Sequence, residues 1–350
     1  LQQALSNTLF DASKILLESG ANVKYLDNQG HNCWHHLVHH RSSNQNEVAK
    51  LAKLLLQYNN EINCQDSAGA TPFYTACLEG NVLTVIELKN LGADINIPNK
   101  GGFHPIYGAV HNGHMAIVAE LLKWGVNINY QSQDGFTPLY YSVICKQDSD
   151  IKIVNFLLDH KANPQIPNNL GHYPLHGAIH NCRLDIVKLL IEKNADINSY
   201  SDEKQVVTPL YYSMGYGRQK ISLEIFDYLL AKGANPNIPV FDGDTVMHMA
   251  GYHARMDLLK KLIKYNGNIN AVNHAGETAL YVCIKHDGLA TNEQKLKAVK
   301  YFIASGATIP TQTTITIFDI VTTHLPDALE WVQHPETIPP LGELELEFFH

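Results

Sequence analysis

A tetrad that opens with Thr-Pro recurs along this 350-residue chain and constrains its fold more than any other feature. Thr71-Pro72-Phe73-Tyr74 and Thr137-Pro138-Leu139-Tyr140 are clear copies. Others begin at His104, Tyr173, Thr208, Thr245 and Thr278, with a weaker one at Asn32, at steps of 33 to 39 residues. A second signature, Gly-Ala-Asp-Ile-Asn or a variant, closes the units, as at residues 92–96 and 194–198. Such periods are typical of solenoids built from stacked supersecondary units.

Each unit is predicted to hold two helices joined by short turns. Thr at the tetrad start is a favourable N-cap, and Pro tolerates the first helical position because its missing N–H has no partner there. An apolar face at i, i+3 and i+4, as in Ile117, Val118 and Leu121, follows on the second helix. Gly125 is expected to end that helix in the left-handed conformation.

These residues resemble the ankyrin-repeat family, and the resemblance covers nearly the whole chain. It implies an all-α solenoid of helix-turn-helix units with short β-hairpin or loop connections. We expect a partial repeat as a cap over residues 1–26, about eight repeats over 27–310, a capping half-repeat over 311–333 and an extended tail over 334–350. Because the chain begins at Leu1, we also expect it to be part of a longer protein.

Composition narrows the classes of function. The formal charge of −8 argues against a nucleic-acid binder, which would carry a basic face. The sequence contains no run of 18 apolar residues, so we expect no membrane insertion. The six cysteines form no C-x-x-C pair and are too sparse for a disulfide framework, which fits a reducing cytosol. Cys77 and Cys283 fall in small helix slots and are interpreted as buried core residues.

The histidines raise the question of a metal site. His35 and His39, and likewise His36 and His40, are spaced i, i+4, which can suit zinc. His35, however, occupies the tetrad position that braces the hairpin in ankyrin repeats, and the pattern offers no obvious third ligand. We therefore interpret these histidines as structural and expect no metal and no cofactor.

Motifs for catalysis are missing from the sequence. It contains no G-x-S-x-G, no G-x-x-x-x-G-K-[ST] and no G-x-G-x-x-G, and no small-molecule substrate is evident. The first hypothesis is therefore a rigid module that binds a partner protein and is not an enzyme. The second is the targeting arm of a larger enzyme whose catalytic domain lies elsewhere, and the third is a catalytic site built within the repeats.

The resemblance implies a partner-binding surface on the concave face and the hairpin tips. Aromatic rings at such positions are the usual anchors of interfaces. For Tyr141 and Tyr212, and for the tip phenylalanines, packing within the array remains an alternative. The expected contact residues are Phe103, Phe136 and Phe241 at the tips, and His111, Tyr141, His180, Tyr212, Tyr216, Tyr252 and His253 on the inner helices.

Insertions between the two helices of some units mark a second possible edge for recognition. They lie near Arg41–Asn46, Lys146–Asp150, Gly215–Lys220 and His286–Glu293. Drift in unconstrained loops is the alternative explanation.

The 30 Asn residues, with many Ile and Lys, indicate an AT-rich genome. Divergent arrays of this kind resemble effectors that Legionella-type intracellular bacteria deliver into the host cytosol. A eukaryotic cytoplasmic protein is the alternative.

Overall fold

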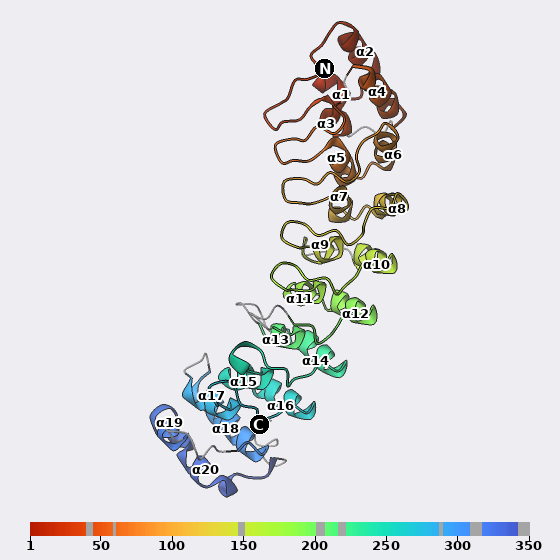
Figure 1. Cartoon of the computed structure of the whole chain (residues 1–350). Coiled ribbons are helices and arrows are strands. Elements are labelled where there is room, and N and C mark those ends of the chain that lie inside the picture. The colour runs from red at the N-terminus through yellow and green to blue at the C-terminus, as the bar shows by residue number, and fades with distance from the viewer. Residues whose placement is uncertain are drawn as a thin grey trace. The chain divides into compact units, whose positions relative to one another are not determined.

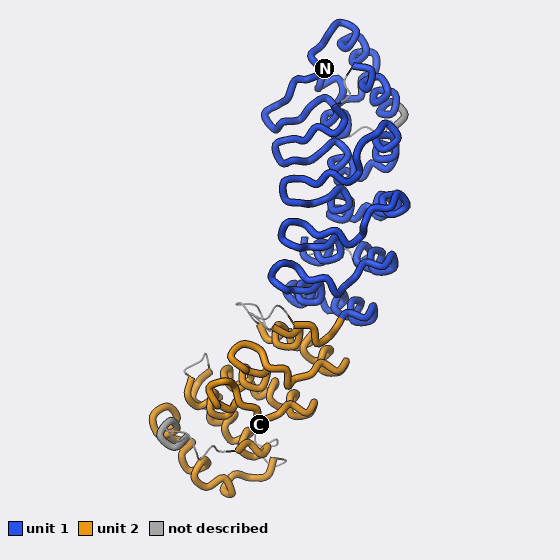
Figure 2. The backbone as a smooth tube through the Cα atoms, in the orientation of Figure 1, with its two compact units in different colours: residues 1–195 blue, residues 196–350 orange. Residues whose placement is uncertain are grey.

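A computed structural model describes residues 1–39, 45–58, 61–145, 151–200, 207–215, 222–286, 290–308 and 317–341. The chain divides into two compact units, Leu1–Ala195 and Asp196–His350, coloured separately in Figure 2. The array expected over residues 27–310 is thus shared between the two units.

Unit 1 consists of helix pairs, each made of an inner helix and an outer helix, and a hairpin loop precedes every inner helix except α1 (Figure 1). Inner helices pack on inner helices, as α5 does on α3 and α7, and outer helices pack on outer ones, as α6 does on α4 and α8. The inner helices are α1 (Gln2–Ser6), α3 (Cys33–Val38), α5 (Pro72–Glu79), α7 (Pro105–His111), α9 (Pro138–Ile144) and α11 (Pro174–His180). The outer helices are α2 (Phe10–Glu18), α4 (Gln45–Tyr58), α6 (Val82–Asn90), α8 (Met115–Lys123), α10 (Ile151–Asp159) and α12 (Leu184–Glu192).

Unit 2 repeats the pattern, with α15 packed on α17 and α16 on α18. Its inner helices are α13 (Pro209–Tyr212), α15 (Val246–Tyr252) and α17 (Ala279–Lys285), and its outer helices are α14 (Leu223–Ala231), α16 (Met256–Lys264) and α18 (Asn292–Ala304). At its end lie α19 (Ile317–His324) and α20 (Leu329–Gln333), and the short 3₁₀ helices are η1 (Phe241–Gly243), η2 (Pro326–Ala328) and η3 (Pro335–Thr337).

The predicted helix boundaries are confirmed by the caps. Thr71 and Thr137 accept from the backbone N–H groups of Tyr74 and Tyr140, and Pro follows each of them at N1. Gly125 takes a φ of 82° after α8, as expected for a left-handed stop. Asn194, with a φ of 64°, takes the same role after α12.

Neighbouring hairpins are joined by backbone hydrogen bonds at their tips. Lys100 N donates to Ala68 O at 3.0 Å, and Gln133 N donates to Gly101 O at 3.1 Å. Within each tip a side chain closes the turn, as when Asn99 Oδ1 accepts from the N–H groups of Gly101 and Phe103. Across the described residues the tips form no β-strand, and one isolated bridge joins Val272 and Thr278.

The core is the apolar seam between inner and outer helices. Ile117, Val118 and Leu121 of α8 are fully buried, as are Ala109 and Ala178 of the inner helices. Within the predicted tail over 334–350, Pro335–Thr337 forms η3, and residues 342–350 lie outside the described part. No helix in the described segments is long and apolar enough to span a bilayer.

Candidate partner-binding surface

Four rings meet on the inner-helix face of unit 1. Phe103, at a hairpin tip, lies 5.1 Å from Tyr107 and 5.2 Å from Tyr141, measured between ring centroids. Tyr141 also lies 5.7 Å from Tyr107 and 5.8 Å from His111. We call Phe103, Tyr107, His111 and Tyr141 the ring cluster. It brings together three of the predicted contact residues.

Tyr141 occupies the centre of the ring cluster and is half-buried. Its hydroxyl lies 3.1 Å from Nδ1 of His111, which joins α9 to α7. Burial raises the pKa of Tyr141, so the phenol stays protonated and can donate to a partner or to His111. Phe103 and His111 are also half-buried, and each therefore keeps part of its ring open to solvent.

The other tip phenylalanines rest on inner-helix rings in the same way. Phe136 lies 5.0 Å from Tyr140, and in unit 2 Phe241 lies 6.4 Å from Tyr211. Both are half-buried, so each combines packing against its own repeat with partial exposure.

Unit 2 carries a hollow of about 340 Å³ on α15, α17 and the adjoining hairpins. Tyr252 and His253, both predicted contact residues, line it with His286, whose ring lies 5.6 Å from that of Tyr252. Burial lowers the pKa of His253, and the nearby Arg255 lowers it further. The carboxylates of Asp244 and Glu277 also line the hollow, and Glu277 forms an ion pair with Lys285 at 2.6 Å.

The remaining predicted residues have different environments. His180 is exposed at the end of α11. Tyr212, on α13, is only 8% exposed, so the expectation of an exposed ring is wrong there and the packing alternative applies. Tyr216 lies outside the described residues, as do residues 41–44, 146–150, 216–220 and 287–289 of the inserted loops.

The repeated helix pairs also match a known protein family. The model of the family described as ankyrin repeats (3 copies) matches residues 40–132, 83–168, 106–201, 144–240 and 218–313. The chain belongs to the ankyrin-repeat family. Ankyrin repeats generally mediate protein–protein interaction, and their fold is an interaction scaffold.

Individual ankyrin relatives match parts of the chain. Mouse synphilin-1 is 27% identical over 100 residues, which are 29% of this chain and 10% of synphilin-1. Palmitoyltransferase AKR1 of Lachancea kluyveri is 32% identical over 110 residues, 30% of this chain and 14% of that protein. The crystal structure of the ankyrin repeat domain of Bcl-3 aligns with a TM-score of 0.57 at 24% identity, covering 67% of this chain and 100% of Bcl-3's. That likeness shows the ankyrin fold alone.

Tyr107 was missed by the sequence reasoning because it fills the ankyrin tetrad position that braces the hairpin. In the same position, Nε2 of His35 donates to the carbonyl oxygen of Ala70 and Nε2 of His248 donates to that of Glu277, each at 3.0 Å. The structural interpretation of His35 is thereby confirmed, and burial lowers its pKa to about 4. A tyrosine or histidine at this tetrad position therefore donates a hydrogen bond to the following hairpin and helps to fix its position.

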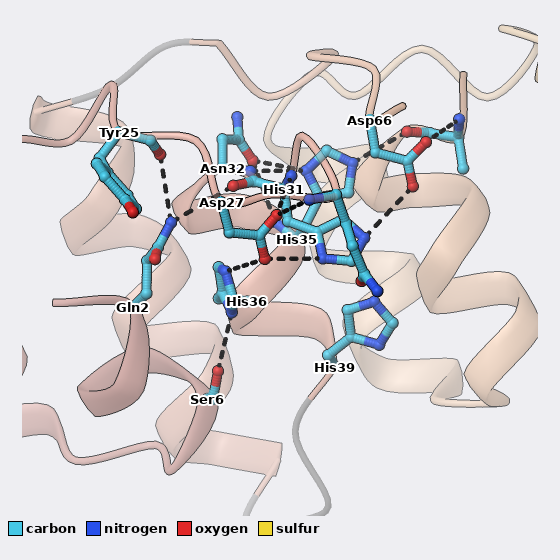
Figure 3. Close-up of polar contacts among 12 residues, drawn as sticks. Gln2, Ser6, Tyr25, Asp27, His31, Asn32, His35, His36, His39 and Asp66 are labelled. Atoms are coloured by element: carbon cyan, nitrogen blue, oxygen red, sulfur yellow. Dashed lines mark hydrogen bonds and ion pairs between the residues drawn. The ribbon is translucent and has the colours of Figure 1, made fainter. Parts of the chain in front are cut away.

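A second group was also missed, at the first hairpin of unit 1. Asp27 lies between His31 and His36, with its Oδ2 3.3 Å from Nδ1 of His31 and 3.2 Å from Nε2 of His36 (Figure 3). Burial acts to raise the pKa of Asp27, but hydrogen bonds from the N–H groups of His31 and Gln29 outweigh it and lower the pKa. Burial lowers the pKa of His36. His40, paired with His36 in the sequence reasoning, lies outside the described residues.

Proposed function

We propose that the chain is a rigid module that holds a partner protein through the hairpin tips and the inner-helix face. The ring cluster is the observation that carries this proposal. The buried Tyr107 packs against Phe103 and Tyr141, with ring centroids 5.1 and 5.7 Å apart, while Phe103, His111 and Tyr141 are only half-buried. Aromatic rings fixed in this way bury much area in an interface with little loss of side-chain entropy.

The unit 2 hollow supports a complementary contact with a basic or hydrogen-bonding side chain. Asp244 and Glu277 supply carboxylates, while Tyr252 and His286 supply flat rings. Lys285 neutralises one carboxylate, and Asn273 Nδ2 donates to Asp244 at 2.9 Å, so the hollow is polar but not strongly acidic. A lysine or arginine of a partner, stacked on Tyr252, suits this lining.

The partner that we propose is a host protein, with this chain acting in the host cytosol as an effector of an intracellular bacterium. The support is compositional and comes from the Asn-, Ile- and Lys-rich sequence. A second candidate function is that of a targeting arm in a larger enzyme. The relative named palmitoyltransferase AKR1 favours it, because 86% of that protein lies beyond the aligned 14%.

The test of the binding surface uses two alanine variants and a matched control. Phe103→Ala removes the exposed edge of the ring cluster, and Tyr252→Ala removes the wall of the hollow. Leu83→Ala is the control, because Leu83 is an apolar side chain 51% exposed on the outer helix α6. A partner captured by the wild type and identified by mass spectrometry is then titrated with each purified variant.

An anchor residue should weaken binding by about 2 kcal/mol, roughly 30-fold in Kd, with the melting temperature nearly unchanged. The Leu83→Ala variant should bind like the wild type. If both Phe103→Ala and Tyr252→Ala bind the partner as tightly as the wild type does, the proposal that the partner binds the inner-helix face is wrong. The full-length coding sequence decides separately between a module and the arm of an enzyme.

A further inference from the structure

The first hairpin of unit 1 places two imidazoles and a carboxylate around one point. The ligand atoms of Asp27, His31 and His36 all lie within 4.8 Å of one another, a grouping that could hold a metal ion. Asp27 and His31 come from the hairpin tip, and His36 comes from α3, the helix that this hairpin precedes. Figure 3 shows the three side chains turned toward each other.

Two of the three separations match the ligand spacing of zinc, and the third, between the two ring nitrogens, is within 4.8 Å. Bonds of about 2.0–2.1 Å at tetrahedral angles hold ligand atoms about 3.3 Å apart. The distances from Asp27 Oδ2 to the two ring nitrogens are 3.3 and 3.2 Å. We propose that Asp27, His31 and His36 bind a divalent transition-metal ion, with zinc as the best match, and that water completes the coordination.

The second ring nitrogen of each histidine faces an outer partner. Nε2 of His31 lies 3.5 Å from Oδ2 of Asp66, and Nδ1 of His36 lies 3.3 Å from Oγ of Ser6. A carboxylate or hydroxyl behind a ligating histidine orients the ring and raises its basicity, as is usual at zinc sites. The side chains of Asp66 and Ser6 come from the next hairpin and from α1, so three repeats converge on this point.

The hairpin turn leaves the ligating oxygen of Asp27 available. Oδ1 accepts from the N–H groups of Gln29 and His31, both at 2.9 Å, which closes the turn. Oδ2 is therefore the oxygen directed at the rings. Nε2 of His36 is shielded from solvent and, among the described residues, makes no well-aligned hydrogen bond, although Oδ2 lies 3.2 Å away. An ion between the two atoms would satisfy both.

An internal comparison separates this arrangement from the repeat itself. The hairpin at residues 168–172 has the same turn and also places a histidine, His172, after the tip glycine. It carries Asn168 in place of Asp27 and Gly177 in place of His36. That hairpin provides one of the three ligands, so a site should form at residues 27–36 and not at 168–177.

The experiment titrates purified wild-type protein with Zn²⁺ by calorimetry and with Co²⁺ by visible absorption. Asp27→Asn is the main variant, because Asn99 and Asn168 hold the same turn in other repeats and the fold should be kept. His36→Thr is the second, because Thr75 fills that slot in the next repeat. The controls are Asn168→Asp, which adds a carboxylate at the incomplete site, and His39→Gln, which removes an exposed histidine of the same segment.

We expect the wild type to bind one equivalent of ion and both Asp27→Asn and His36→Thr to lose this binding. The Co²⁺ absorption spectrum typical of nitrogen and oxygen ligands should disappear in the same two variants. Both control variants should keep the bound equivalent and the spectrum. Asp66→Asn should weaken binding by about 10–100-fold, the usual effect of removing an outer partner. In ¹⁵N spectra the imidazole signals of His31 and His36 should shift on adding Zn²⁺. Equal stoichiometry and spectra for wild type and Asp27→Asn would overturn the proposal.

Discussion

The hydroxyl of Tyr107 lies 2.6 Å from the carbonyl oxygen of Phe136 and 2.5 Å from that of Tyr130, so α7 holds the hairpin of the following repeat. The hydroxyl has one hydrogen, which it can donate to either oxygen. Phe136 is a proposed contact residue, and its placement therefore depends on a buried residue of the preceding repeat. Burial also raises the pKa of Tyr107, which keeps this donor protonated.

Replacing Tyr107 by Phe should destabilise the protein by about 1–2 kcal/mol. The loss comes from a buried hydrogen bond, and it is limited because Phe136 O still accepts from Ser132 N at 2.9 Å. Chemical denaturation measures the free energy of unfolding. Tyr25→Phe is the control, since Tyr25 is an exposed ring, and it should leave the free energy unchanged. An equal loss in both variants would contradict a bracing role for Tyr107.

Gly251→Ala in α15 should be destabilising, although alanine normally stabilises a helix interior by about 0.5–1 kcal/mol relative to glycine. A Cβ at Gly251 would lie 2.5 Å from the backbone carbonyl oxygen of Ala279 in α17, and backbone cannot yield as a side chain can. We expect a net loss of about 1–3 kcal/mol.

Gly177→Ala in α11 is the matched comparison. There the nearest atom is Cγ2 of Ile144, at 2.9 Å, and a side-chain methyl can rotate away. Its stability should stay within about 1 kcal/mol of the wild type. Denaturation curves that rank Gly177→Ala as the more damaging variant would show that α15 and α17 are less closely packed than the structure has them.

Local chemistry made the helix boundaries predictable, because each depends on residues within one turn. The start of α5 depends on the side-chain oxygen of Thr71, which accepts a hydrogen bond from Tyr74 N, and on the fixed φ of Pro72. The group around Asp27 was not predictable in this way. A spacing of i, i+4 on one helix relates His36 to His40, whereas His31 reaches His36 from a loop, and Asp27 joins them only through the hairpin turn.

The signal that could have revealed His31 is its place in the repeat. It follows the tip glycine, as Phe103 does, and that position turns its side chain toward the inner helices. For Tyr212 the sequence left two outcomes open, a ring exposed to a partner and a ring packed within the array. It has the same tetrad context as Tyr141, and only the packing around α13 distinguishes the two.

The abundance of Asn also has a structural cause that composition could not show. The side-chain oxygen of an Asn in one repeat accepts from a backbone N–H in the next, at 2.9 Å from Asn63 to Asp94 and from Asn129 to Asn163, and at 2.8 Å from Asn198 to Asn235. These bridges recur within each unit. They give many Asn residues a role that does not depend on the base composition of a genome.

The thiols of Cys77 and Cys283 should react slowly with a thiol reagent in the native protein. Both are buried, and burial raises the pKa of each, that of Cys283 to about 12, so little thiolate exists at neutral pH. Cys182 is exposed and should react first. Mass spectrometry of protein quenched at short times identifies the labelled positions. Labelling of Cys77 as fast as Cys182 would indicate local opening of α5.

His104 should make the stability of unit 1 depend on pH. It is the N-cap of α7, where it makes no side-chain cap hydrogen bond, and its ring stacks on Tyr130 with centroids 3.9 Å apart. Burial lowers the pKa of His104 below the ordinary value of a histidine, about 6.5. Protonation is disfavoured further because the cationic ring would lie at the positive end of a helix.

The unfolded chain therefore binds this proton more readily than the folded one as the pH falls. The contribution of the neutral His104 ring to the free energy of unfolding is fully present above the unfolded pKa of about 6.5. This contribution is lost as the pH falls through the lower pKa that His104 has in the folded protein. His104→Thr removes the titration and restores the capping residue that Thr71 and Thr137 provide in other repeats. The free energy of unfolding of wild type minus variant, measured from pH 8 to pH 5, should fall toward acid. A difference that stays constant over this range would mean that His104 is equally easy to protonate in the folded and unfolded chain, and that its stacking on Tyr130 does not exclude water.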